Sequence, residues 1–435
     1  QHPKEKSDTV TILEKIGHFT DEENTRLYEK YKNQNLTNIE IAKKIGNELD
    51  LPSILKNASK KWDGGYVLSG MIGHGDAFAL RDSSGIRPAY YFQNDEVVVV
   101  TSERPVIQTA FNVDASDIKE LPRGTAIIIK RDGNVSFSEI TPKKPRKACS
   151  FERIYFSRGN DYKIHQERKM LGALLTDEVL KQINSDYANT IFSYIPNTAE
   201  TAFYGLLSSL EDSLNAHKQK IGEEQGLEAM KSIMHQKIRV EKIAVKDAKL
   251  RTFITSDNDR DGLVGHIYDV TYGVANKEDT LIVLDDSIVR GTTLKKSILR
   301  ILDRLKLKKI IVVSSAPQIR YPDCYGIDMA KLGDFIAFNA VIGLLNGTNE
   351  GKLIIRQTLE KCKQAIQRPK EEQTNHVKDI YSPFSDKQIS QQIAKLLKTK
   401  NISTDVDVVF QSVANLHKAC PNHLGDWYFT GDYPT

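Results

Sequence analysis

The chain has 435 residues, of which 40% are hydrophobic and 27% are charged, and its formal net charge is +4. This length suffices for two or three domains, each with its own hydrophobic core. No segment has the roughly 20 consecutive apolar residues of a membrane span. Basic and acidic residues are interspersed along the chain, which does not indicate a nucleic-acid-binding surface. The four cysteines are widely spaced, with no CxxC pair, so neither a disulfide framework nor a zinc site is predicted. We expect a soluble, cytoplasmic protein without nucleic-acid or membrane partners.

Residues 1–140 are predicted to form an α+β domain. Residues 8–60 have the apolar spacing and the composition that are typical of helices. Short apolar runs follow, interrupted by Gly, Asp, Asn and Ser, which is the pattern of an antiparallel sheet. The runs are Gly65–Ile72, Asp76–Asp82, Arg87–Phe92, Glu96–Thr101 and Gly124–Lys130. The next segment, 141–148, is rich in Pro and Lys, and we interpret it as a linker.

Residues 149–367 are predicted to form a parallel α/β domain, because apolar strands alternate there with longer helical segments such as Leu294–Leu305. The clearest strands are expected at Thr190–Ile195, Thr280–Leu284 and Lys309–Val313. A long charged segment, 202–242, contains no proline and predicts a helix with one solvent-facing side. The remaining residues, 368–435, have the composition of a mostly polar helical extension with an aromatic end.

The run from Val283 to Thr293 combines the features of a sugar-phosphate site. Ligands of an open parallel sheet bind beyond the carboxyl ends of its strands, where Asp285 and Asp286 are expected, and carboxylates accept hydrogen bonds from ribose hydroxyls. Glycine allows close backbone approach, and amides and hydroxyls at a helix N-terminus attract a phosphate. The residues in question are Arg290, Gly291, Thr292 and Thr293. An alternative is that Asp286 or Ser287 only caps a helix and the rest is a connecting loop.

This run resembles the phosphoribosyl pyrophosphate (PRPP) signature of the type I phosphoribosyltransferases. Further segments resemble the glutamine phosphoribosylpyrophosphate amidotransferases, and the resemblance covers most of the chain. These segments are Ile72–Pro88, Cys149–Arg158, Leu250–Ile254 and Ser315–Pro322, the last followed by Tyr325–Met329. The fold that the resemblance implies is part of an N-terminal-nucleophile (Ntn) glutaminase domain followed by a type I phosphoribosyltransferase domain with a parallel sheet.

The activity that the resemblance implies joins two reactions. Glutamine is hydrolysed in the first domain, and the ammonia displaces pyrophosphate from PRPP in the second to give 5-phosphoribosylamine, the first dedicated step of de novo purine biosynthesis. The resemblance also implies Mg2+, inhibition by purine nucleotides and a homo-oligomer. Two alternatives are a PRPP-binding regulator without turnover and a phosphoribosyltransferase that acts on a nucleobase.

Residue roles in the second domain follow from the same resemblance. Asp285 and Asp286 would bind the ribose hydroxyls and the metal, the Arg290–Thr293 segment would hold the 5′-phosphate, and Ser287 would also bind PRPP. A pyrophosphate loop is implied, with Thr198 as a further metal ligand, although an ordinary Pro-Asn turn is the alternative. Its residues are Pro196, Asn197, Thr198, Ala199, Glu200 and Thr201. Arg251 would belong to a flexible loop that closes over PRPP, or would be a solvated surface charge.

The glutaminase reaction of the family needs an N-terminal cysteine, whereas this chain begins with Gln1. We expect the longer gene product to begin Met-Cys or to carry a propeptide before that cysteine. Asp8 resembles the aspartate that holds the α-amino group of glutamine, although a helix cap at Ser7-Asp8-Thr9 is the alternative. Cys149 and Cys324 fall near ligand positions of an iron–sulfur cluster found in some family members. The C-terminal pair of cysteines is missing, and we expect no cluster.

Overall fold

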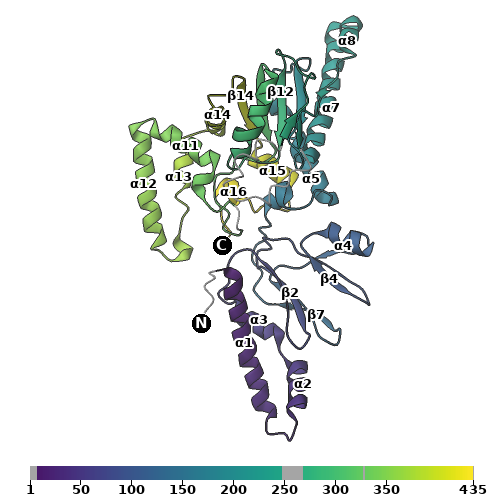
Figure 1. Ribbon diagram of the computed structural model, residues 1–435, viewed down its shortest axis with the longest axis vertical. Helices are drawn as coiled ribbons and strands as arrows, with labels where there is room; N and C mark the ends of the chain where they lie inside the picture. The colour runs from purple at the N-terminus through teal and green to yellow at the C-terminus, as the bar shows by residue number, and fades with distance from the viewer. Residues whose placement is uncertain (1–6, 247–267, 327–328, 435) are drawn as a thin grey trace. The chain divides into compact units, whose positions relative to one another are not determined.

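The computed structural model describes residues 7–246, 268–326 and 329–434, which divide into two compact units (Figure 1). The first unit comprises the described residues up to Cys149 together with Pro434, and the second runs from Ser150 to Tyr433. Within the described ranges, no helix is both long enough and apolar enough to cross a bilayer.

The first unit consists of three helices followed by strands that form two antiparallel sheets, in the orders β1-β2-β6-β7 and β4-β3-β5. The helices and the β-rich segment lie where the sequence predicts them. The elements are α1 (Asp8–Tyr31), α2 (Asn38–Glu48), α3 (Leu51–Ser59), β1 (Val67–Met71), β2 (Ala77–Arg81), β3 (Tyr90–Gln93), β4 (Val98–Thr101), α4 (Arg104–Phe111), β5 (Lys119–Glu120), β6 (Thr125–Ile129) and β7 (Val135–Glu139).

Alternating side chains build the layers of the first unit, because successive residues of a strand point to opposite faces of a sheet. On β2, Phe78 and Leu80 pack against Leu55 of α3, whereas Ala79 packs against residues of β3 and β4. Ile107 of α4 packs on the far side of that second sheet. The layers therefore follow the order helix, sheet, sheet, helix.

The second unit alternates strands and helices over most of its length. Its main elements are η1 (Glu152–Phe156), α5 (Tyr162–Ala173), α6 (Thr176–Gln182), β8 (Thr190–Tyr194), α7 (Glu200–Gln225), α8 (Leu227–Ile233), β9 (Arg239–Val240), β10 (Ala244–Lys246), β11 (Tyr268–Val270), β12 (Thr280–Asp285), η4 (Leu294–Ile298), α10 (Leu299–Leu302), η5 (Asp303–Leu305), β13 (Lys309–Ser314), η6 (Leu332–Asp334), α11 (Ile336–Asn346), α12 (Asn349–Ile366), η7 (Lys370–Glu372), α13 (Lys378–Tyr381), α14 (Asp386–Leu397), β14 (Asp405–Phe410), α15 (Val413–Ala419) and α16 (Trp427–Thr430).

A parallel sheet in the order β14-β13-β12-β8-β9 forms the centre of the second unit. Leu281 and Val283 of β12 point toward α10, α11 and α14, whereas Ile282 and Leu284 point toward α6 and α7. Parallel strands that are buried on both faces have unbroken apolar sequences, which explains the runs that predicted these strands. The predicted helix in the charged 202–242 segment is α7, which runs beside the sheet and is followed by α8 (Figure 1).

The segment expected to be a polar helical extension contributes a strand to this sheet. β14 pairs with β13 in parallel register, with Val408 opposite Val312. Asp405 is exposed while Val406 and Val408 are buried. The Asp-Val-Asp-Val alternation is a strand pattern, but it is short and lies between helical segments, so the composition of the surrounding sequence dominated the interpretation.

The aromatic end of the chain is part of a core. Trp427 and Tyr428 are fully buried. The Trp427 Nε1 group donates a hydrogen bond to Asp323 Oδ1 at 3.3 Å, and its ring meets that of Tyr325 edge-on with centroids 4.8 Å apart. Tyr428 lies 5.2 Å from the ring of Phe151. The Tyr428 contact joins α16 to the start of the second unit, and the Trp427 contacts join it to the segment after β13.

Helices α5 and α7 cross at two glycines. A Cβ atom added to Gly172 would lie 1.7 Å from the carbonyl oxygen of Ala202, and one added to Gly205 would lie 1.8 Å from that of Lys169. Neither distance is compatible with a side chain. The two helix backbones therefore approach each other closely only because both positions lack a Cβ atom.

We expect Gly205→Ala to lower the free energy of unfolding of the second unit by about 3 kcal/mol, because α5 and α7 would have to separate. Gly343→Ala on α11 is the control, since its new Cβ would meet only the flexible amide nitrogen of Gln392, at 3.3 Å. That variant should stay within about 1 kcal/mol of the parent. Chemical denaturation followed by circular dichroism compares the two, and equal stabilities would contradict the close crossing.

A partly buried ion pair joins β9 to the loop before β12. Arg239 donates from Nη1 to Asp279 Oδ1 at 2.6 Å and from Nη2 to Oδ2 at 3.0 Å, and the Asn276 amide donates to Oδ2 at 2.9 Å. Asp279 is fully buried. Burial alone would raise the pKa of its carboxyl, but the Arg239 hydrogen bonds, the Asn276 amide and the Arg239 charge outweigh burial and lower the pKa.

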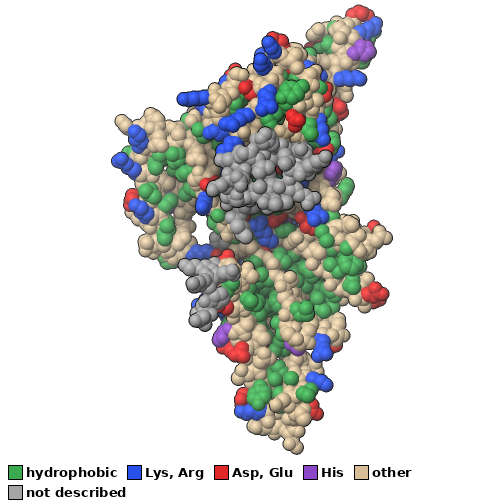
Figure 2. Space-filling view, viewed as in Figure 1, with side chains coloured by type: hydrophobic (Ala, Val, Ile, Leu, Met, Phe, Trp, Pro, Cys, Tyr) green, Lys and Arg blue, Asp and Glu red, His purple; other side chains and the backbone are tan. Residues whose placement is uncertain are grey.

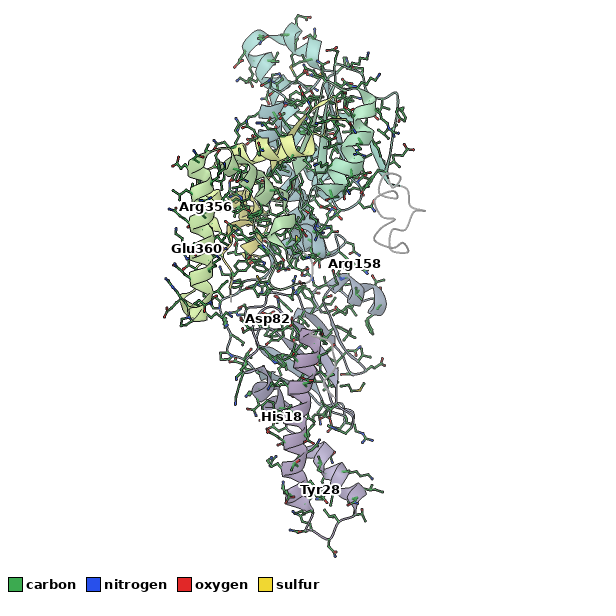
Figure 3. All side chains as sticks on the ribbon, turned by 60° about the vertical axis from the view of Figure 1, so that its left-hand side comes forward. His18, Tyr28, Asp82, Arg158, Arg356 and Glu360 are labelled. Atoms are coloured by element: carbon green, nitrogen blue, oxygen red, sulfur yellow. The ribbon has the colours of Figure 1, made fainter. Side chains whose placement is uncertain are left out.

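Arg239→Met should lower the free energy of unfolding by about 2 kcal/mol at neutral pH, because it leaves Asp279 buried without its partner. The lowered pKa stabilises the fold above about pH 4, the unfolded value, and this contribution is lost as the pH falls through the folded pKa. The difference between variant and parent should therefore shrink in acid denaturation series. Arg356→Met is the control on exposed α12, where Figure 3 labels Arg356. An equal loss in both variants would contradict this role.

Candidate functional site

A cavity of about 540 Å³ lies in the second unit at the carboxyl ends of β8 and β12. The sheet order shows why it forms there. From β8 the chain continues to β9 on one side, whereas β12, β13 and β14 follow one another on the other side. The connections diverge at this switch point, and the crevice between them is where open parallel sheets bind ligands.

Two segments predicted from the sequence meet in this cavity. One comprises Asp285 to Thr293, and the other comprises Pro196, Asn197 and Thr198. They are about ninety residues apart in the chain, yet β8 and β12 are neighbours, with Tyr194 opposite Leu284. The arrangement places an acidic pair, a hydroxyl-rich turn and a second turn around one volume.

The acidic pair is held by short-range hydrogen bonds. The Asp286 amide donates to Asp285 Oδ1 at 3.0 Å, and the Ser287 hydroxyl donates to Asp286 Oδ1 at 3.1 Å. Burial, and then the neighbouring Asp286 charge, raise the pKa of Asp285 well above its usual value. Burial also raises the pKa of Asp286, although hydrogen bonds from Ser287 and Thr198 and the charge of Arg168 oppose it. A cation between the carboxylates would relieve this repulsion.

The residues present fit Mg2+, which prefers oxygen ligands and usually shares its coordination with substrate oxygens and water. Asp285, Asp286 and the Thr198 hydroxyl supply such oxygens at the cavity. Within the described parts of the chain, no three His, Cys, Asp or Glu side chains come together to hold a metal by themselves. A bound ion would therefore depend on oxygens from the substrate.

Gly291 also has a packing role, beside the close approach to a ligand that the sequence predicts. Its φ of +68° is in the left-handed region, and an added Cβ would lie 2.5 Å from Ile336 Cδ1 and 2.9 Å from Leu397 Cδ2. The glycine thus lets the turn pack on the core, while its backbone lines the cavity. Beside it, Thr292 and Thr293 are exposed, and Arg290 Nε lies 3.4 Å from Asp334 Oδ2 in a half-exposed pair.

A group of aromatic side chains, here called the aromatic wall, also lines the cavity. It was not identified from the sequence as part of a site, although it lies partly in the Cys149–Arg158 segment. Its members are Phe151, Tyr155, Phe156 and Tyr268, with Met329 beside them. Burial, followed by the charges of Asp285 and Asp286, raises the pKa of Tyr268 to about 12, so its hydroxyl stays protonated.

Three members of the predicted 196–201 loop do not line the cavity. Ala199 is buried, and Glu200 and Thr201 are the first residues of α7. The Glu200 Oε1 atom accepts hydrogen bonds from Tyr194 at 3.0 Å and from Tyr204 at 2.8 Å. Because Tyr194 ends β8 and Glu200 begins α7, this contact ties together the two ends of the loop.

Tyr194→Phe should lower the free energy of unfolding of the second unit by about 1 kcal/mol, because it removes a partly buried hydrogen bond. Tyr204→Phe removes a hydroxyl from the same acceptor at an exposed position and should cost less. Urea denaturation of both variants measures the difference. A larger loss in the Tyr204 variant would show that the loop ends are not held through Tyr194.

The remaining predicted residues lie elsewhere. Asp8 is exposed in the first turn of α1, and its neighbour Ser7 makes no side-chain capping bond. Arg251 falls outside the described residues. Cys149 and Cys420 are buried, and Cys324 is exposed. Burial raises the pKa of the Cys420 thiol, which makes it a poor nucleophile.

Comparison with known proteins places these observations in context. No family model matches the chain. It is 25% identical over 326 residues to an amidophosphoribosyltransferase of Lachancea kluyveri, covering 72% of this chain and 58% of the relative. It is 26% identical to that of Pseudomonas aeruginosa, covering 63% and 51%. The chain thus spans little more than half the length of the curated relatives that it matches.

Solved structures give the same relationship in three dimensions. A glutamine PRPP amidotransferase from B. subtilis, complexed with ADP and GMP, matches with a TM-score of 0.55 and 23% identity, covering 94% of this chain and 74% of that chain. A second, described as the allosteric regulatory enzyme of purine biosynthesis, has a TM-score of 0.58 at 23% identity, covering 95% and 73%. The predicted fold class, an Ntn-type domain followed by a type I phosphoribosyltransferase domain, is confirmed. This chain is similar in sequence to the amidophosphoribosyltransferases and has the fold of the PRPP amidotransferases.

Proposed function

We propose that the protein is an amidophosphoribosyltransferase, which makes 5-phosphoribosylamine and pyrophosphate from PRPP and glutamine-derived ammonia. The observation that carries this proposal is the meeting of Asp285–Thr293 and Pro196–Thr198 at the switch point of the sheet. One cavity thereby offers a partner to each part of PRPP. The sequence similarity to amidophosphoribosyltransferases supports the choice of nitrogen donor.

In the proposed complex, Asp285 and Asp286 accept hydrogen bonds from the ribose hydroxyls. Backbone amides and hydroxyls of the Arg290–Thr293 turn hold the 5′-phosphate, with Ser287 beside them, and the Pro196–Thr198 turn holds the pyrophosphate. Mg2+, held by Asp285, Asp286 and Thr198 together with substrate oxygens, would neutralise charge on the pyrophosphate as it leaves.

The proposed reaction needs positioning more than covalent help from the protein. The ammonia nitrogen attacks the ribose C1 atom, the bond to pyrophosphate breaks, and the amine loses a proton. The acidic pair fixes the ribose so that C1 faces the nitrogen. The aromatic wall of Phe151, Tyr155 and Phe156 limits the access of water, which would compete with ammonia.

The wider assignment follows from the same proposal. The first unit is part of the glutaminase, with Asp8 holding the α-amino group of glutamine; the N-terminal cysteine that this reaction requires is not among the 435 residues. We further propose a cytoplasmic homo-oligomer that purine nucleotides inhibit and that involves neither nucleic acid nor membrane. In this proposal, Ala199, Glu200 and Thr201 shape the pyrophosphate loop, and Arg251 belongs to a loop that closes over PRPP.

The assay is pyrophosphate release from PRPP with Mg2+ and ammonium. We expect turnover in the parent chain and a loss of about 10²–10³-fold in Asp286→Ala, because the ribose and the metal lose a ligand. Asp212→Ala removes an exposed carboxylate from α7 and should leave the rate unchanged. Circular dichroism verifies that both variants are folded.

Other outcomes distinguish the alternatives. Pyrophosphate release that depends on orotate or hypoxanthine, and that neither glutamine nor ammonium supports, would identify a nucleobase phosphoribosyltransferase. Tight PRPP binding without release under any of these conditions would identify a regulator. Either result would overturn the proposal.

A further inference from the structure

A second charged cavity, of about 290 Å³, lies within the first unit. It is lined by four cationic side chains and a single carboxylate, together with small or apolar residues. The lining residues are Arg81, Gly85, Glu120, Leu121, Pro122, Arg123, Lys143 and Arg146. None of them takes part in the cavity at Asp286 or in the roles proposed above.

Arg81 forms the floor of this cavity, and its position is fixed. Its side chain is 3% exposed. It donates from Nε to the Arg87 carbonyl at 2.8 Å, from Nη1 to Glu120 Oε1 at 2.6 Å and the Leu121 carbonyl at 2.9 Å, and from Nη2 to the Gly85 carbonyl at 3.1 Å. A guanidinium has five N–H groups, so one on Nη2 has no acceptor among the described residues.

Gly85 keeps the floor open. A Cβ atom at this position would lie 3.3 Å from Arg81 Nη2 and 3.5 Å from Arg123 Cβ. With hydrogen in its place, the remaining N–H group of Arg81 is not covered by a side chain at residue 85. A buried cation with a spare donor is a strong attractor for an anion.

The lining of the cavity contains more cationic side chains than carboxylates. Glu120 accepts from Arg81 through Oε1 and from Arg146 through Oε2 at 3.0 Å. Burial raises the pKa of Glu120, but Arg146 and Arg81 outweigh it and keep the carboxylate ionised. Arg123 donates only from Nε, to the Lys144 carbonyl at 2.7 Å, so its terminal nitrogens have no acceptor in the described structure.

Lys143 completes the rim and is only weakly paired. Its Nζ atom lies 3.7 Å from Glu139 Oε2, and both side chains are about half exposed. Such a pair contributes little in water. The charges of Arg123 and Lys143 are therefore left largely uncompensated beside the spare donor of Arg81.

The backbone around the cavity is held in place before any ligand arrives. Asp82, which Figure 3 labels, is buried and accepts hydrogen bonds from the amides of Ser84 and Ile86 at 3.0 Å each. The 141–148 segment, interpreted above as a linker, is tied to the same loop. The backbone amide of Lys144 donates to the Ser83 carbonyl at 3.0 Å, and the backbone amide of Lys147 donates to the Ser84 carbonyl at 2.9 Å. These bonds hold the segment that carries Lys143 and Arg146, which line the same cavity as Arg81.

We propose that this cavity binds a small, multiply charged oxyanion of the phosphate class, either free phosphate or pyrophosphate or the phosphate group of a metabolite. Arginine N–H groups match phosphate oxygens in geometry, and the cavity offers the terminal nitrogens of Arg123, one N–H group of Arg81 and the Lys143 ammonium group. The excess of positive charge disfavours cations, and the charged walls disfavour apolar ligands. The proposal does not depend on the reaction proposed for the second unit.

The test is calorimetric titration with inorganic phosphate, pyrophosphate and ribose 5-phosphate at about 0.15 M salt, where distant charges are screened. Arg123→Gln with Lys143→Gln should weaken one binding event by about tenfold or more. The matched control, Arg356→Gln with Lys352→Gln on exposed α12, removes the same charge and should change affinity less than about twofold.

Hydrogen exchange locates the event. Phosphate should protect the amides of residues 83–87 and 141–148 in the parent and in the control, but not in the Arg123/Lys143 variant. Equal weakening in both double variants, or phosphate binding that the Arg123/Lys143 change leaves intact, would overturn the proposal. So would binding of citrate in preference to all three phosphates. Asp286→Ala, which disables the second-unit cavity for PRPP, should leave this protection unchanged, so the two sites are tested separately.

Discussion

The parallel pairing of β8 with β12 is the constraint on which the candidate site depends. Its register places Tyr194 opposite Leu284, so both strands end at the same edge and their following turns meet. The turn after β8 supplies Thr198, and the strand end of β12 supplies Asp285 and Asp286. A shift of one residue would turn alternate side chains to the opposite face and separate these groups.

Helices on both faces make that pairing stable. The apolar residues of β12 alternate between two cores, and one of these cores includes α7, which begins at Glu200 immediately after the 196–199 turn. α7 in turn lies close to α5 because Gly172 and Gly205 lack side chains. The packing of the sheet and the geometry of the turn are consequently linked through one helix, with Glu200 joining its start to Tyr194.

Charge burial follows one rule in both units, although the two cavities have opposite character. A buried charged group is held by several directed hydrogen bonds, as for Arg81 in the first unit and Asp279 in the second. At the two candidate sites, the buried charge is not fully balanced by groups of opposite charge. Asp285 and Asp286 repel each other, and the Arg81 cavity has more cationic side chains than carboxylates. On the visible face of the molecule, Figure 2 shows basic and acidic side chains interspersed, as the composition predicts. Unbalanced charge inside a cavity distinguishes the two candidate sites from a surface whose charges are solvated.

In the second unit, the sequence by itself determined β8, β12 and β13, the acidic pair and the Arg290–Thr293 turn, because an apolar run followed by these residues is a local pattern that needs no knowledge of the rest of the chain. It did not reveal β14, since a short Asp-Val alternation is recognisable as a strand only when β13 lies beside it. Nor did it show that Glu200 faces two tyrosines or that Gly291 packs on Ile336. Only the tertiary structure decided these features and the Arg81 cavity. The pairing of β14, the packing of Gly291 and the Arg81 cavity bring together segments far apart in the chain, and the Glu200 contacts depend on the conformation of the turn between β8 and α7.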